Sequence, residues 1–169
     1  MRVPRRRSEI LRRSKIEQDD HLTPQAIGRL EKELHDLRHR ERPEVLREVT
    51  RTREMGDLSE NAAYHDAKAR LARIDGRIFS LEERLKSAIP IRVGADPSGR
   101  IRIGSTVVVR SDGKKYTYQM LGSHEVDPSR GRISHQSPLG AALVGHVVGE
   151  DVMVKIRDRE VVYHILEVK

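Results

Sequence analysis

The sequence predicts an α+β protein in which a long antiparallel coiled-coil hairpin precedes a small β-rich domain with one short helix. Two observations predict this. Apolar residues in the first half recur at alternating spacings of three and four, as in helices that pack along a seam. From residue 101 onward, short β-branched and aromatic runs alternate with turn residues. The expected organisation is a basic, mobile tail at 1–21, the hairpin at 22–90, a linker at 91–100 and the β-rich domain at 101–169.

The heptad rhythm defines two arms. In the second arm it is carried by Tyr64, Ala67, Leu71, Ile74, Ile78, Leu81, Leu85 and Ala88, and in the first by Ile27, Leu30, Leu34 and Leu37. The segment between the arms is only a few residues long, so the two helices must run antiparallel. Thr23 is expected to cap the first arm with Pro24 at its first position, and Gly56 to end it.

The first arm carries an irregularity. The rhythm shifts to four-residue spacings through Glu41, Val45 and Val49, which locally unwinds a supercoil. Pro43 lies inside this run and has no backbone N–H to donate. We therefore expect a bend there.

The second half predicts strands joined by tight turns. Runs at 106–110 and 116–121 are joined across Ser111, Asp112 and Gly113, and runs at 152–156 and 161–168 are joined across residues 157–159. A short strand is expected at 132–134. Ser137 followed by Pro138 predicts the start of a short helix.

Composition excludes several classes of protein. The 169 residues include no cysteine, so disulfides and thiolate metal sites are impossible and a reducing cytoplasm is the expected compartment. Aromatic residues make up 3% and tryptophan is absent, too little for a platform that stacks single-stranded nucleic acid. No apolar run is long enough to cross a membrane.

No catalytic apparatus of the chain's own is visible. The histidines are scattered without metal-ligand spacing, and four of them are expected on the surface or in turns: His124, His135, His146 and His164. Ser137 lacks a nucleophile context, and a glycine-rich phosphate loop is absent. We expect no enzyme activity and no cofactor bound by this chain alone.

The positive charge has two interpretations. The net charge is +7, and the basic tail predicts non-specific attraction to DNA or RNA. On the hairpin, arginines crowd the half of the first arm nearest the turn: Arg38, Arg40, Arg42, Arg47, Arg51 and Arg53. They form either a solvated face paired with nearby acids or a positive surface for a phosphate backbone.

The turn between the arms, residues 56–61, holds two acids. Asp57 followed by Glu60 has the spacing of a capping box, and Ser59 is an alternative cap. The same two carboxylates could instead bind Mg²⁺, which prefers oxygen ligands. Two protein ligands do not hold Mg²⁺ tightly, so a partner would have to complete the site.

Two motifs carry a family resemblance. GDLSENAAY at residues 56–64, with RPEV at 42–45 and IDGRI at 74–78, closely resembles the Gre family of bacterial transcript cleavage factors. ISHQSPLGAALVG at 133–145, with GED at 149–151, resembles that family's C-terminal motif. The match covers residues 22–169. The RPE stretch leans toward the GreB type and the SPLG block toward the GreA type, so the subgroup stays open.

The resemblance implies a mechanism. In this family the coiled coil enters the secondary channel of RNA polymerase, while the C-terminal domain, similar to FK506-binding proteins, docks at the rim. Asp57 and Glu60 would then help hold a Mg²⁺ shared with polymerase, which cleaves backtracked RNA. Carried over by motif position, Ser59, Asn61 and Tyr64 would shape the tip, and Arg53 and Lys68 would contact the nascent RNA 3′ segment.

Two other functions stay open. A protein of the same fold can occupy the polymerase channel as an inhibitor, although the retention of both acids argues against it. A coiled-coil adaptor that binds nucleic acid through its arginines would leave the acidic turn dispensable. The basic tail is longer than is usual in the family, and its role is unassigned.

Overall fold

A computed structural model describes residues 19–55, 61–156 and 159–169. The chain forms two compact units, one made by Pro24–Ala88 and the other by the segment ending at Thr23 together with Ile89–Lys169. The α+β fold class is confirmed. The expected hairpin boundaries, 22 and 90, each lie two residues outside the observed helical unit.

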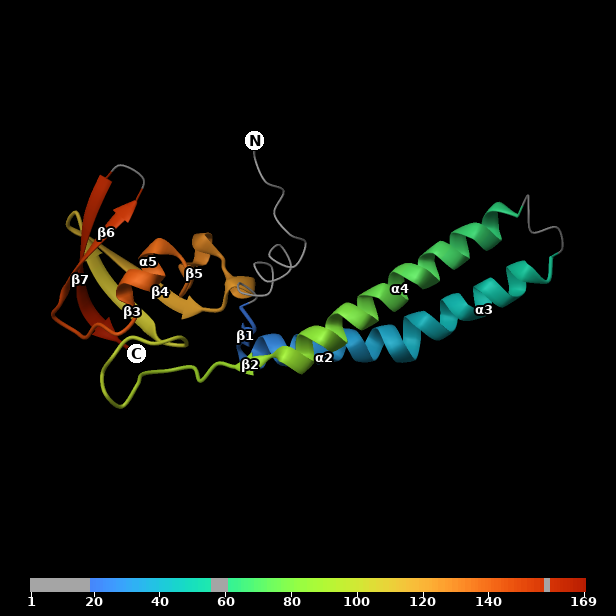
Figure 1. Ribbon diagram of the computed structural model, residues 1–169, viewed down its shortest axis with the longest axis horizontal. Coiled ribbons are helices and arrows are strands. Elements are labelled where there is room, and N and C mark those ends of the chain that lie inside the picture. Colours follow the sequence, from blue (N-terminus) through green and yellow to red (C-terminus); the bar gives the residue numbers. More distant parts are fainter. Residues whose placement is uncertain (1–18, 56–60, 157–158) are drawn as a thin grey trace, which may run out of the picture. The chain divides into compact units, whose positions relative to one another are not determined.

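The helical unit is a two-armed hairpin (Figure 1). The first arm comprises α2 (Pro24–Asp36), the π-helix η1 (Leu37–Glu41) and α3 (Arg42–Arg53), and the second is α4 (Ala62–Ser87). Its buried residues form a narrow seam. Leu37, Val45, Ala67 and Leu81 are positions of the predicted rhythm, whereas Ala26 and Thr52 are not. None of the helices in the described part of the chain combines the length and apolar composition that a membrane span requires.

The irregularity in the first arm is the π-helix. The backbone N–H of Arg42 donates to the carbonyl of Leu37, five residues earlier, instead of four. Pro43 follows immediately and has no N–H with which to resume the regular ladder. A one-residue insertion of this kind is a common way for a helix to absorb such a break. The sequence pattern placed the irregularity at residues 41–49, and the structure has it slightly earlier, as a π-helix at Leu37–Glu41.

Among the described residues, four ion pairs join the two arms. Arg38 pairs with Glu82, and three further nitrogen–oxygen contacts measure 2.7 Å for Arg42–Asp75, 2.8 Å for Arg70–Glu48 and 2.7 Å for Arg77–Glu33. All are partly exposed, so each contributes at most about 1 kcal/mol. Their main consequence is to favour one register of the arms.

The second unit is built on a five-stranded sheet of order β5-β4-β3-β7-β6. Its strands are β3 (Thr106–Ser111), β4 (Lys114–Leu121), β5 (Arg132–Ser134), β6 (Asp151–Ile156) and β7 (Arg159–Val168). All five predicted strands are confirmed. The pairing is antiparallel except between β4 and β5. Asp112 (φ 50°) and Gly113 (φ 74°) make the two-residue turn between β3 and β4.

One face of this sheet carries the core. Val107 and Val109 alternate inward from β3, and Leu143 reaches the same cluster from the short helix α5 (Pro138–Leu143). Ser137 caps α5 by accepting a hydrogen bond from the Gly140 N–H at 3.1 Å, as predicted. A Cβ on Gly140 would lie 2.0 Å from the carbonyl oxygen of Ser134, so only glycine lets the helix pack this closely.

The segment before the first arm belongs to this second unit. β1 (His21–Leu22) pairs in parallel with β2 (Ile89–Pro90). Residues 19–21 were expected in a mobile tail and 91–100 in a linker, but Asp19 and Ile91 are buried, and Ile91 donates its N–H to Leu22 at 2.8 Å. This short parallel pairing joins distant segments, which local pattern does not reveal, whereas residues 92–100 contain no helix or strand. Residues 1–18 lie outside the described residues.

Candidate functional site

Asn61 organises the described edge of the turn between the arms. Its Oδ1 accepts a hydrogen bond from the Tyr64 N–H at 3.0 Å, which makes Asn61 the N-cap of α4. Its Nδ2 donates to the carbonyl oxygen of Thr52 on α3 at 2.7 Å. One side chain therefore starts the second arm and ties it to the end of the first.

The capping interpretation of the acids concerns residues that the structure does not describe, but the cap of α4 itself is visible. The helix begins at Ala62, and Asn61 satisfies its first-turn donor. Asp57, Ser59 and Glu60 themselves lie outside the described residues.

Thr52 supports the same junction from the other arm. It is buried, and its Oγ1 donates to the carbonyl oxygens of Glu48 at 2.8 Å and Val49 at 3.1 Å. Its own carbonyl accepts both from Asn61 and from the Met55 N–H, the latter at 3.3 Å. The end of α3 is therefore held by side-chain and backbone bonds together.

The remaining predicted site residues flank this junction. Arg53 is the last residue of α3 and is exposed, and Lys68 is exposed on α4. Neither has an ion-pair partner among the residues that the structure describes. Tyr64 is half-buried in the first turn of α4, with its ring centroid 5.7 Å from that of His65.

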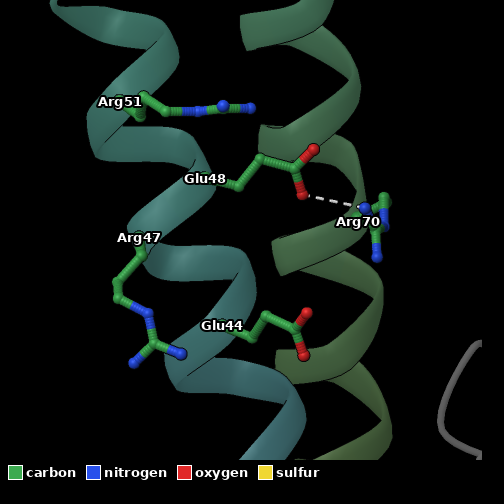
Figure 2. Close-up of a pocket in the computed structure, with 5 residues that line it drawn as sticks. All are labelled: Glu44, Arg47, Glu48, Arg51 and Arg70. Atoms are coloured by element: carbon green, nitrogen blue, oxygen red, sulfur yellow. Dashed lines mark hydrogen bonds and ion pairs between the residues drawn. The ribbon is translucent and has the colours of Figure 1, made fainter.

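A charged groove runs beside the junction between the two arms. It encloses about 390 Å³ and is lined by Glu44, Arg47, Glu48, Arg51 and Arg70. Figure 2 shows Glu48 reaching across to Arg70, while Arg51 extends from α3 toward α4. Within the described ranges, Arg47 and Arg51 have no ion-pair partner. Glu44 also lines the groove, so its three guanidinium groups outnumber its two carboxylates.

Some of the arginines are therefore paired with acids, and others leave a positive surface. Arg38 and Arg42 are paired with acids of the other arm. No acid of the described residues pairs with the others in the crowded half of the first arm, namely Arg40, Arg47, Arg51 and Arg53. The half nearest the turn keeps a positive surface, which favours contact with phosphate.

Fold and site together define a class: a protein with a coiled-coil hairpin that bears charged groups at its turn and is followed by a β-rich domain. Two family models match the chain over these parts, transcription elongation factor, N-terminal, over residues 21–89 and transcription elongation factor, GreA/GreB, C-terminal, over residues 96–169. The chain belongs to the GreA/GreB family of transcription elongation factors.

The chain is also similar to individual proteins of this family. The chain is 40% identical over 150 residues to the transcription elongation factor GreA of Rhodospirillum rubrum, covering 88% of this chain and 96% of that protein. It is 40% identical over 149 residues to GreA of Thermomicrobium roseum, with the same coverage. Among solved structures, GreA factor homolog 1 of Thermus thermophilus matches with a TM-score of 0.39 at 27% identity, over 88% of this chain and 97% of that one.

Proposed function

We propose that this chain inserts its hairpin into the secondary channel of RNA polymerase and stimulates the polymerase's own cleavage of backtracked RNA. The observation that supports this proposal most directly is that Asn61 caps α4 and joins it to Thr52. The helix start therefore does not require the carboxylates of Asp57 and Glu60 as its cap. Both acids can serve a partner's site.

The donor set fits a shared Mg²⁺. Asp57 and Glu60 offer carboxylate oxygens, the ligand type that Mg²⁺ prefers, and too few of them to hold the ion without polymerase and RNA phosphates. Such an ion, when bound, stabilises the attacking and leaving oxygens of a phosphoryl displacement. This chain's contribution is to deliver the two side chains from a hairpin end fixed by Asn61 and Thr52, with Ser59 and Tyr64 shaping that end.

We propose that the basic residues near the turn contact the RNA. Arg53 and Lys68 are exposed and have no acidic partner among the described residues, as contact with the nascent 3′ segment requires. Arg47 and Arg51 extend this surface along the groove of Figure 2. Guanidinium groups suit phosphate because they present several donors in one plane.

The chain itself hydrolyses nothing in this proposal. The β-rich unit serves to dock on polymerase, and the activity belongs to the cytoplasmic complex. The test is to add the full chain and Mg²⁺ to a backtracked polymerase complex and to follow the release of short 3′ RNA fragments. Fragments that form only when polymerase and this chain are both present support the proposal.

The alternatives give different outcomes in the same assay. A channel-occupying inhibitor would bind polymerase and slow elongation without releasing fragments. A nucleic-acid-binding adaptor would release none and would not need the polymerase channel. Either result would overturn the proposal, and a polymerase-binding measurement separates the two.

A further inference from the structure

A cluster of potential metal ligands lies in the second unit. Asp19, His21 and His135 each place one ligand atom so that all three lie within 4.8 Å of one another. His21 Nδ1 lies 2.9 Å from Asp19 Oδ1, and His135 Nδ1 lies 3.5 Å from Asp19 Oδ2. The two imidazole rings meet edge to face, with centroids 5.4 Å apart. We call these three residues the Asp19 cluster.

Backbone pairing brings the cluster together. Asp19 and His21 arrive with β1, which is held by its parallel partner β2. A Cβ on Gly122 would lie 2.0 Å from the carbonyl oxygen of His21, so glycine permits the close approach of the two segments. His135 follows β5 directly, and its N–H donates to the carbonyl of Leu121 at 3.1 Å. The arrangement therefore does not depend on mobile side chains alone.

We propose that the Asp19 cluster binds one divalent transition-metal ion through the Asp19 carboxylate and the imidazoles of His21 and His135. Two imidazoles and a carboxylate are a set that zinc accepts, with water as the fourth ligand. Bonds of 2.0–2.2 Å place the ligand atoms of a tetrahedral site roughly 3.4 Å apart. His21 Nδ1 lies 2.9 Å from Asp19 Oδ1 and His135 Nδ1 lies 3.5 Å from Asp19 Oδ2, so each imidazole is near this separation from one oxygen of the carboxylate.

Neighbouring donors orient the carboxylate. Asp19 Oδ2 accepts hydrogen bonds from the backbone N–H of Ser123 at 2.5 Å and from its hydroxyl at 2.8 Å. Burial alone would raise the pKa of Asp19, but the hydrogen bonds from Ser123 and His21 hold it below its ordinary value. The side chain is thus an oriented carboxylate at neutral pH, as a ligand must be.

Metal binding would cost the protein few existing bonds. Each imidazole must present an unprotonated nitrogen, which a neutral histidine achieves by moving its proton to the other ring nitrogen. Leu121 O, 3.3 Å from His135 Nδ1, would still accept the backbone N–H of His135. Asp19 Oδ1 would still accept the backbone N–H of His21 at 3.2 Å.

The cluster is also reachable from solvent. The side chain of Asp19 is only 1% exposed, whereas those of His21 and His135 are 32% and 19% exposed. An ion can therefore enter from the histidine side and keep a water ligand. Because His135 is distant in sequence from Asp19 and His21, the ion would cross-link the N-terminal segment to the β-rich domain.

Zinc titration of the full chain tests this inference. We expect calorimetry to show one saturable zinc site, which the His21→Gln and His135→Gln variants each weaken by at least about tenfold. The matched controls are His146→Gln and His164→Gln, whose imidazoles each pair with a single carboxylate at 2.6 Å. A further control is His35→Gln, because His35 and His39 lie close together on the first arm.

A second measurement on the unmodified chain guards against variants that do not fold. Zinc should shift the imidazole nitrogen resonances of His21 and His135 in NMR spectra and leave those of His146 and His164 in place. The inference is overturned if no saturable site exists, if binding survives in both cluster variants, or if it disappears in His35→Gln. In the last case the site lies on the hairpin.

Discussion

Asn61 Nδ2 lies 2.7 Å from the carbonyl oxygen of Thr52, a hydrogen bond that joins the two arms directly beside the turn between them. The same side chain caps α4 through Tyr64. The start of the second arm and its attachment to the first therefore depend on one residue. An amide suits this position because it both accepts and donates.

Substitutions of Asn61 should separate its two roles. Asn61→Ala loses both bonds and should destabilise the hairpin by about 1–3 kcal/mol. Asn61→Asp keeps a good cap but loses the donor to Thr52, so it should cost less. Hydrogen exchange of amides in the first turn of α4 measures the local effect. Equal protection in the parent and Asn61→Ala would contradict the assigned role.

The cross-arm pair of Arg42 and Asp75 should couple weakly. Their nitrogen–oxygen distance is 2.7 Å, but both side chains are more than two-fifths exposed. A double-mutant cycle with alanine at each position should give about 0.2–1 kcal/mol, decreasing as salt is added. Helix unfolding followed by far-UV circular dichroism measures it. A coupling that salt leaves unchanged would show that the pair is not a screened surface interaction.

Two glycines should respond oppositely to alanine. Gly140→Ala forces a Cβ to 2.0 Å from the carbonyl oxygen of Ser134 and should destabilise the β-rich unit by about 1–3 kcal/mol. Gly76→Ala meets nothing within 4 Å on α4 and should stabilise the hairpin by about 0.5–1 kcal/mol. Urea unfolding measures both. A neutral Gly140→Ala would refute the close packing of α5.

Asp19 should contribute stability that acid removes. Burial opposes its charge, but the bonds from Ser123 and His21 lower its pKa in the folded state. Its contribution is therefore present above the ordinary carboxyl pKa of about 3.9 and is lost as pH falls through the lower folded value. Asp19→Asn should reduce stability at pH 7 by about 1–3 kcal/mol and by less in acid.

Urea unfolding of Asp19→Asn and of an exposed control, Glu160→Gln, at neutral and acidic pH measures this difference. EDTA should be present so that metal binding does not contribute. A deficit of Asp19→Asn that is the same at both pH values would contradict the ionised role of Asp19.

Local pattern was enough to predict much of the fold. The heptad rhythm predicts the two arms because a packed seam must repeat with the helix, and the change at Pro43 marks the π-helix η1. Strands β3 and β4 follow from β-branched runs and the turn residues Asp112 and Gly113. In each case the determining interactions lie within one or two turns of chain.

Contacts between residues far apart in the sequence were not predicted. Asp19 and Ser123 lie 104 residues apart, and nothing in either segment indicates their hydrogen bonds. His135 was correctly expected in a turn, but its neighbours Asp19 and His21 could not be foreseen. At the hairpin turn, the acid spacing suggested a capping box among residues that the structure does not describe, and Asn61, which caps α4, was not predicted as a cap. Spacing alone could not distinguish several residues that can each cap a helix.

The most direct test of the central claim is the rate of RNA cleavage in backtracked polymerase complexes at fixed Mg²⁺. We predict that Asp57→Asn and Glu60→Gln each lower the rate by about a hundredfold or more while binding to polymerase persists. Asp66→Asn, an exposed acid of α4, is the matched control and should cleave as the parent does. Equal rates in all three variants would contradict the claim that the two acids complete the polymerase's metal site.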